Sequence, residues 1–196
     1  MKGFGKILFL GGLLVALLVL GRGLYYAPNG EVHYVADKTP TLPDAGASLP
    51  VRLLIPKLDI DADVQRLGIT ASGNMAAPNN FVDVSWYKFG TIPGATGSAV
   101  IAGHEDNALS LDGVFKHLED LNLNDRVYVV GESGERLEFK VVEKRIYPYN
   151  LSGPELERIF NAKDKSRLNL ITCAGEWLAS AHTNDKRLVV FTELVK

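Results

Sequence analysis

The amino-acid sequence predicts a mainly β domain with two short helices, preceded by a membrane-spanning segment and a proline-rich connection. Three observations lead to this prediction. Short runs of β-branched and apolar residues recur throughout residues 51–196, and turn-forming residues separate these runs. An uncharged apolar run, Ile7–Leu20, lies near the N-terminus. Many short strands favour a closed barrel or a sandwich, and the pattern alone does not choose between them.

Residues 1–26 are expected to form an uncleaved membrane anchor. The run Ile7–Leu20 is short, because its fourteen residues would span about 21 Å of a hydrocarbon core about 30 Å thick. Lys6 and Arg22 lengthen it, since both side chains can reach the head groups. A cleaved signal peptide is the alternative, but Tyr25 lies where cleavage requires a small side chain. Two lysines before the run and one arginine after it favour a single-pass protein with a cytoplasmic N-terminus and an extracellular domain.

Residues 27–50 are expected to form an extended stem. The segment shows no apolar periodicity, and prolines interrupt it at Pro28, Pro40, Pro43 and Pro50. Residues 51–196 then provide one domain of ordinary size.

Several apolar runs in this domain are expected to be strands. They are Val51–Ile55, Ala99–Ala102, Arg126–Val130, Leu137–Ile146, Leu168–Thr172 and Leu188–Val195. The runs Arg126–Val130 and Leu137–Val141 are expected to pair as a hairpin across Gly131–Arg136. In the second of them, apolar and charged residues alternate as in a half-buried strand.

Two short helices interrupt the strands. The stretch Leu111–Leu121 carries apolar residues at helical spacing, and this predicts a helix that packs on the core. The stretch Pro154–Phe160 begins with a proline, which suits a first helical turn. Ser152 is its expected N-cap.

The composition excludes several classes of function. Lysine and arginine total 21 against 23 acidic residues, a net charge of −2, so nothing attracts nucleic acid. The sequence has no phosphate-binding loop and no dinucleotide motif. The spacings of Cys173 to His182 and of His104 to Asp106 match no compact zinc site. Glu105 and Asp106 are too few for calcium. No cofactor or metal is therefore expected.

Cys173 is the first candidate for a functional residue. An exported chain with one cysteine has no intramolecular disulfide, so its thiol is either reactive or linked to another chain. The alternative is a buried cysteine that acts as a small apolar residue. Cys173 ends the run Leu168–Thr172 and precedes Ala174 and Gly175. We expect this strand end to expose the thiol to a substrate.

His104 and Arg187 are predicted to lie at strand ends too. His104 follows the run Ala99–Ala102, and Arg187 precedes the last run, Leu188–Val195. A cysteine, a histidine and an arginine form a sufficient set for acyl transfer. The thiolate is the nucleophile, the imidazole transfers protons near neutral pH, and the guanidinium stabilises negative charge on a carbonyl oxygen. The alternative interpretations are a surface or satisfied core histidine for His104, and a surface ion pair with Asp185 or a solvated strand start for Arg187.

The remaining candidates are weaker. His33 lies in the stem and His117 in a predicted helix, whereas His182 is a competitor to His104 if the loop Ala174–Lys186 folds over the thiol. Trp177 either lines a substrate groove or belongs to the core.

The segments around these residues resemble the three catalytic segments of the sortase family. They are Ile101–His104, Leu170–Gly175 and Arg187–Phe191. A wider resemblance to the class E and F subgroup is carried by Val51–Asp61, Leu67–Pro78, Trp86–Ser98 and Val114–Val127. The resemblance covers nearly all of residues 51–196.

The resemblance implies an eight-stranded β-barrel with two or three short helices, and a two-step transpeptidation. Cys173 would attack the threonine carbonyl of a sorting signal similar to Leu-Pro-x-Thr-Gly and form a thioacyl-enzyme. An amine from a cell-wall precursor or a protein subunit would then accept the acyl group. His104 would act as acid and base, Arg187 would position the substrate or stabilise the oxyanion, and Thr172 would assist.

Two other classes of function remain as alternatives. A different cell-wall cysteine enzyme, such as an L,D-transpeptidase, would carry a Ser/His-Gly-Cys signature, which Ile171–Ala174 does not match. A non-catalytic exported barrel that binds a surface partner is the other alternative, although such a module has no need of Cys173, His104 and Arg187 together. The sorting motif, the amine acceptor and the choice between a housekeeping and a pilus-assembly role are left open.

Overall fold

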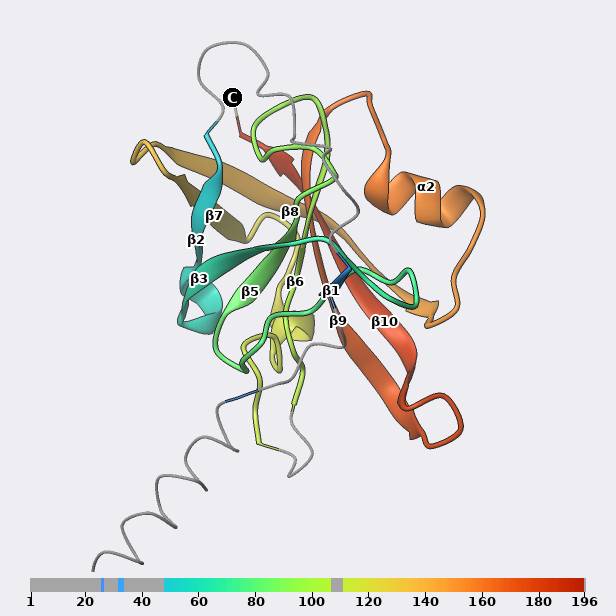
Figure 1. Cartoon of the computed structure of the whole chain (residues 1–196). Helices are drawn as coiled ribbons and strands as arrows, with labels where there is room; N and C mark the ends of the chain where they lie inside the picture. The colour runs from blue at the N-terminus through green and yellow to red at the C-terminus, as the bar shows by residue number, and fades with distance from the viewer. Residues whose placement is uncertain (1–25, 27–31, 34–47, 107–110, 196) are drawn as a thin grey trace, which may run out of the picture.

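The computed structural model describes residues 26, 32–33, 48–106 and 111–195. Within them, eight strands close into a barrel in the order β10-β8-β7-β2-β3-β5-β6-β9 (Figure 1). The strands are β2 (Pro50–Ile55), β3 (Ile60–Leu67), β5 (Val84–Tyr87), β6 (Gly97–Ala102), β7 (Arg126–Gly131), β8 (Arg136–Pro148), β9 (Ser166–Leu178) and β10 (Thr183–Leu194). The mainly β prediction is thus confirmed, and of the two architectures left open the barrel is found.

Three helical segments and one small sheet accompany the barrel in the described residues. The helix α2 spans Pro154–Phe160, and two 3₁₀ turns span Pro56–Leu58 and Leu118–Asp120. The short strands β1 (Val32–His33) and β4 (Ile69–Thr70) pair outside the barrel.

Two strand pairs of the barrel are parallel, β3 with β5 and β6 with β9, and the other pairs are antiparallel. The pair β6–β9 runs in register from Gly97 opposite Ser166 to Ala102 opposite Ile171. It joins segments far apart in the sequence. Because β9 also pairs with β10, this pair brings the end of β6 beside the last hairpin of the chain.

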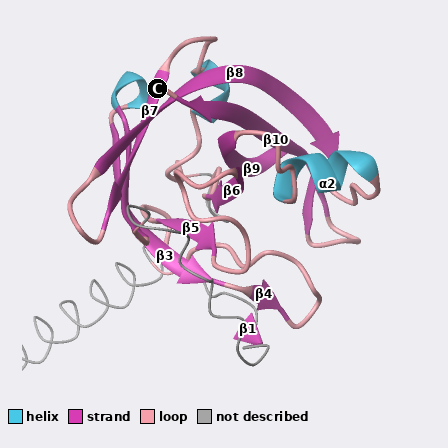
Figure 2. Cartoon of the chain, turned by 90° about the horizontal axis from the view of Figure 1, so that it is seen from above, coloured by secondary structure: helices cyan, strands magenta, loops and turns pink. Residues whose placement is uncertain are grey.

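Side chains alternate between the barrel interior and its outer surface. The interior holds the large, fully buried Trp86, Phe115 and Phe139. A second apolar cluster lies on the outer surface and is made by Val100, Tyr147, Ile159, Val189 and Phe191. Figure 2 shows α2, which contributes Ile159, outside the barrel wall near β8.

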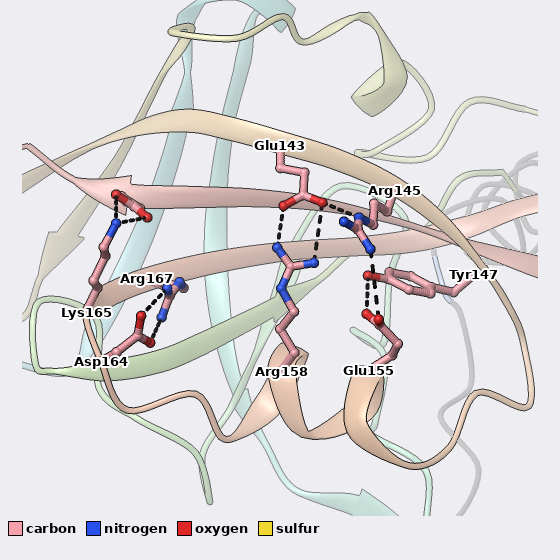
Figure 3. A network of polar contacts seen from close by, with 9 residues as sticks. Glu143, Arg145, Tyr147, Glu155, Arg158, Asp164, Lys165 and Arg167 are labelled. Carbon is pink, nitrogen blue, oxygen red and sulfur yellow. Dashed lines mark hydrogen bonds and ion pairs between the residues drawn. The ribbon is translucent and has the colours of Figure 1, made fainter.

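Polar contacts fasten α2 to this outer cluster (Figure 3). The Arg158 guanidinium pairs with the Glu143 carboxylate and lies 4.4 Å from the centre of the Phe191 ring. The Tyr147 hydroxyl donates to Glu155 at 3.0 Å. Ion pairs at the protein surface contribute little to the stability of the fold by themselves. Here they lie over the apolar side chains of the outer cluster, which α2 already covers.

The structure confirms several predicted elements and extends others. The hairpin of β7 and β8 and the helix Pro154–Phe160 are present as expected. The N-cap of α2 is Gly153 and makes no side-chain cap, so the prediction of Ser152 was wrong. The strands β3 and β5 were not predicted.

The predicted helix Leu111–Leu121 is not an α-helix. It contains turns followed by the 3₁₀ turn Leu118–Asp120. The backbone N–H groups of Gly113, Val114 and Phe115 donate to carbonyls of other segments, so they form no helical ladder.

Of the predicted anchor, only Tyr26 is described, and its backbone forms an isolated antiparallel bridge with Asn80. Most of the predicted stem lies outside the described residues, but Val32–His33 within it forms β1, and Pro50 at its end begins β2. Within the described part of the chain, no helix is both long enough and apolar enough to cross a bilayer.

Candidate active site

Cys173 lies in the middle of β9 and not at a strand end, so this part of the prediction was wrong. The strand continues to Leu178 because it forms a long hairpin with β10 that extends beyond the barrel (Figure 1). On its other edge, however, the pairing with β6 ends at Ile171. Cys173 is therefore held by β10 on one side and lies just past the end of β6 on the other.

Arg187 is the direct cross-strand partner of Cys173. It does not open the last strand as predicted, because β10 begins at Thr183. Directly opposed residues of an antiparallel pair point to the same face, with Cβ atoms about 4.5–5.5 Å apart. Both residues follow the alternation of Ile171, which packs against the outer cluster, and Val189, which belongs to it. The thiol and the guanidinium thus project from the same outer face.

The guanidinium of Arg187 is anchored to its own strand. Nη1 donates to the carbonyls of Asn184 at 2.9 Å and Lys186 at 2.7 Å, and Nη2 donates to the Thr183 hydroxyl at 2.6 Å. These contacts use three of the five N–H donors of the group. They fix the fork of the guanidinium beside Cys173.

His104 follows the end of β6 by two residues, and its approach to β9 is fixed by two hydrogen bonds. The Gly103 N–H donates to the Ile171 carbonyl at 3.1 Å. The Thr172 hydroxyl donates to the Gly103 carbonyl at 2.9 Å. The residue before His104 is therefore tied to the two residues before Cys173, and the three candidate segments meet where β6 ends beside the middle of β9 and β10.

Burial favours the neutral form of both the Cys173 and the His104 side chains. Burial raises the pKa of the Cys173 thiol, the Arg187 guanidinium partly offsets this effect, and the Glu105 and Asp106 carboxylates add to it. Burial lowers the pKa of the His104 imidazole against the opposing effects of the Pro78 carbonyl and Asp106. The site therefore favours a neutral thiol and a neutral imidazole over an ion pair before substrate arrives.

Thr172 and Trp177, the two assisting candidates, lie in different surroundings. Thr172 is buried, and its hydroxyl hydrogen is used by Gly103, so its role here is to join two segments. Trp177 is 62% exposed on the extended hairpin, so it does not belong to the core. Its proposed contact with a substrate stays a prediction.

The competing histidines lie away from this arrangement. His182 is exposed in the turn between β9 and β10. The five residues of strand from Cys173 to Leu178 place that turn about 16 Å from the thiol. The loop Ala174–Lys186 is thus mostly strand and does not fold over Cys173. His117 is an exposed residue beside Asp112 and Asp120.

An acidic pair follows His104 directly. Glu105 and Asp106 both approach the Lys116 amine, at 3.6 and 3.8 Å. Glu105 also lies 3.5 Å from the side-chain amide of Asn184 on the hairpin. Within the described residues, no three histidine, cysteine or acidic side chains are grouped closely enough to hold a metal ion.

Sequence reasoning missed the segment that touches the His104 ring. The Pro78 carbonyl lies 2.9 Å from Nε2. The Phe81 ring packs on the imidazole with centroids 5.0 Å apart. In the sequence, Pro78 stood out only as part of a segment that resembles the sortase family. Its contact with His104 could not be predicted, because every residue has a backbone carbonyl.

A closed barrel with a cysteine and an arginine side by side, and a histidine segment tied next to them, is an arrangement that suits acyl transfer through a cysteine. The family model described as the sortase domain matches residues 53–195. The chain belongs to the sortase family, whose members are cysteine transpeptidases that act on sorting signals and amine nucleophiles. No curated protein matches the chain.

Solved sortase structures share this fold. A lid mutant of sortase A from Corynebacterium diphtheriae has a TM-score of 0.57 at 20% identity, over 87% of this chain and 86% of that chain. Sortase A from Listeria monocytogenes has a TM-score of 0.55 at 21% identity, over 77% and 89%. Sortase C1 from Streptococcus agalactiae, in complex with MTSET, has a TM-score of 0.56 at 18% identity, over 74% and 68%.

Proposed function

We propose that this chain is a membrane-anchored cysteine transpeptidase with Cys173 as its nucleophile. Its substrate is a sorting signal similar to Leu-Pro-x-Thr-Gly on an exported protein, and its acceptor is an amine of a cell-wall precursor or a protein subunit. Family membership supports the reaction class. The observation that carries the assignment of residues is the cross-strand pairing of Cys173 with Arg187 beside the segment that precedes His104.

The first step forms a thioester. The Cys173 sulfur attacks the threonine carbonyl carbon while His104 accepts the thiol proton, and negative charge develops on the carbonyl oxygen. The two N–H donors that Arg187 retains are available to that oxygen. Collapse of the intermediate breaks the threonine–glycine bond, and His104 returns its proton to the leaving glycine amine.

The second step transfers the acyl group. The acceptor amine attacks the thioester carbon, and His104 takes the proton that the amine loses. The carbon–sulfur bond then breaks, and His104 returns this proton to the sulfur, which restores the Cys173 thiol and the neutral imidazole. Since burial favours neutral forms of both residues, the resting enzyme has a protonated thiol and a neutral imidazole as base. Proton transfer then accompanies attack on the bound substrate, which limits reaction of the thiol with water-borne electrophiles.

The membrane placement is also part of the proposal. The uncharged run Ile7–Leu20 and the basic residues on either side support an anchor at residues 1–26, with the barrel outside the cell. Residues 27–50 would act as the stem that holds the barrel off the bilayer. Such a placement brings the enzyme to proteins that emerge from the membrane.

Transpeptidation by the full chain tests the proposal. The chain is incubated with a Leu-Pro-x-Thr-Gly peptide and an amine, and the product is followed by mass spectrometry. We expect product with the unaltered chain and with His182→Ala, and loss to background with Cys173→Ala. A peptide library then identifies the sorting motif, because the acyl-enzyme traps the preferred sequence on Cys173. Product formation that persists in Cys173→Ala would sink the mechanism.

A further inference from the structure

The ring of His104 is bound to the protein through one nitrogen. Nε2 lies 2.9 Å from the Pro78 carbonyl oxygen. A carbonyl oxygen only accepts hydrogen bonds, so Nε2 must carry the hydrogen whenever this contact is made. In a neutral imidazole the other nitrogen, Nδ1, then has a lone pair and no hydrogen.

The Pro78 carbonyl is held in place by a folded loop, Ala76–Asp83. Within it, the Oδ1 atom of the buried Asn80 accepts the backbone N–H groups of Val82 at 3.0 Å and Asp83 at 2.8 Å. The Nδ2 group of Asn80 donates to the Asp83 carboxylate at 2.6 Å. The asparagine thus ties the residues that follow Pro78 into one turn.

The start of the same loop is tied to the barrel. The Ala76 N–H donates to the Gly68 carbonyl at 3.0 Å, and the hydroxyl of the buried Ser85 donates to the Ala76 carbonyl at 2.9 Å. Pro78 itself is buried. The carbonyl that meets His104 therefore has little freedom to move.

A second segment fixes the backbone of His104. The Phe115 N–H donates to the His104 carbonyl at 2.9 Å, and the Gly113 N–H donates to the Glu105 carbonyl at 2.8 Å. A Cβ atom at Gly113 would lie 2.4 Å from the His104 carbonyl oxygen, so only glycine permits this approach. The Val114 N–H donates to the Phe81 carbonyl at 2.8 Å, which joins this segment to the loop Ala76–Asp83.

We propose that the Pro78 carbonyl fixes the neutral His104 ring as the Nε2–H tautomer. Nδ1 is then the nitrogen that exchanges protons with the reacting groups. Asn80 is the positioning residue that holds the Pro78 carbonyl in place. The inference rests on the proposed function for its catalytic meaning. The tautomer itself does not depend on it. When Nδ1 takes a proton, Nε2 keeps its hydrogen and its bond to Pro78, so the ring stays in place through both steps of the reaction.

The tautomer is measured by NMR on the full chain with ¹⁵N-labelled histidine. The His104 signals are assigned as those missing in His104→Gln. We expect the neutral ring of His104 to carry its hydrogen on Nε2, as a single slowly exchanging N–H. A ring hydrogen on Nδ1, or an Nε2 hydrogen that exchanges as fast as that of the exposed His182, would overturn the proposal.

The role of Asn80 is measured with Asn80→Ala. We expect the exchange of the Nε2 hydrogen to become about fivefold to tenfold faster, which corresponds to the loss of about one net hydrogen bond. Asn161→Ala, at the exposed end of α2, is the matched control and should leave the exchange unchanged. Asn80→Ser keeps a side-chain oxygen for the N–H groups of Val82 and Asp83 and adds no charge beside the Asp83 carboxylate, so it should restore part of the protection. Unchanged exchange in a folded Asn80→Ala protein contradicts the role of Asn80.

Activity gives an independent readout. Displacement of the base slows proton transfer and leaves Cys173 and Arg187 unchanged, so Asn80→Ala should lower kcat about tenfold with little change in KM. A rise in KM at unchanged kcat would contradict a positioning role. The NMR measurement is also possible in Cys173→Ala, which has no nucleophile. The transpeptidation assay therefore tests the proposed function, and the NMR signals of the His104 ring test this inference separately.

Discussion

Gly175, two residues after Cys173, provides the sharpest test of how the hairpin supports the site. Its φ is +79°, and a Cβ atom there would lie 2.0 Å from Oδ1 of Asp185. The same oxygen accepts the Glu176 N–H at 2.8 Å. Gly175→Ala therefore has two consequences: a left-handed residue gains a side chain, and the Asp185 carboxylate must move away from the Glu176 N–H.

The two consequences have different magnitudes. A left-handed conformation destabilises a residue with a Cβ by about 1–2 kcal/mol. The lost hydrogen bond to a carboxylate adds about 1.5–3 kcal/mol. Gly134→Ala isolates the first effect, because Gly134 has φ +85° and nothing within 4 Å of its Cβ position. We expect Gly175→Ala to be about 2 kcal/mol less stable than Gly134→Ala, which is about 4–8 °C in Tm for a domain of this size.

Urea unfolding and thermal melts of the full chain measure this difference. Thioacyl-enzyme formation is measured alongside, and we expect it to slow in Gly175→Ala and to stay unchanged in Gly134→Ala. Equal losses of stability in the two variants would refute the interpretation of Asp185 as a fixed member of the hairpin.

Further predictions concern the charges around the nucleophile and the helix α2. Glu105→Gln removes a carboxylate that helps to raise the pKa of Cys173, after burial as the main cause. A lower pKa of Cys173 gives more thiolate at pH 7. Alkylation of Cys173 by iodoacetamide should therefore become faster, and the pH profile of alkylation should shift to lower pH. Slower alkylation would contradict the role of Glu105. Arg158→Ala removes the pair with Glu143 and the contact with Phe191. It should lower stability by about 1 kcal/mol, seen as a Tm lower by about 2–4 °C, and an unchanged Tm would show that α2 is held by its apolar face alone.

The sequence predicted the β class and six of the eight barrel strands because apolar alternation is a local signal. It missed β3 (Ile60–Leu67), whose burial pattern alternates poorly, and β5 (Val84–Tyr87), which is only four residues long. It also gave β9 an end at Thr172. The stretch that follows, residues 173–178, shows no apolar alternation and is half-buried or exposed, and it forms a strand because it pairs with β10.

The failed helix at Leu111–Leu121 has a physical explanation. Its buried residues Phe115, Leu118 and Leu121 recur every three positions, which suits turns and a 3₁₀ segment as well as an α-helix. The N–H groups of Gly113 and Phe115 bond to the chain around His104 instead of to their own segment. Periodicity predicted the buried face from Phe115 to Leu121, whereas Leu111 is exposed, and tertiary hydrogen bonds decided the backbone conformation.

Only part of the candidate site could be predicted, because tertiary contacts decide the rest. Residue types and the resemblance pointed to Cys173, His104 and Arg187, and the pairing of Cys173 with Arg187 follows from a strand register that no local pattern encodes. The contact of His104 with Pro78 involves a main-chain atom. Side-chain chemistry is visible in a sequence, whereas the backbone groups that orient it become visible only in the folded chain.

The parallel pairing of β6 with β9 also sets an order in time. Arg187 reaches Cys173 through a hairpin, which is a local structure that forms within microseconds. His104 reaches the same place through contacts that span 69 residues, and such contacts form late because a long loop must close first. We therefore expect a folding chain to pair Cys173 with Arg187 in the hairpin before His104 arrives. If His104 is the base, as proposed, the reaction starts only once the barrel is closed.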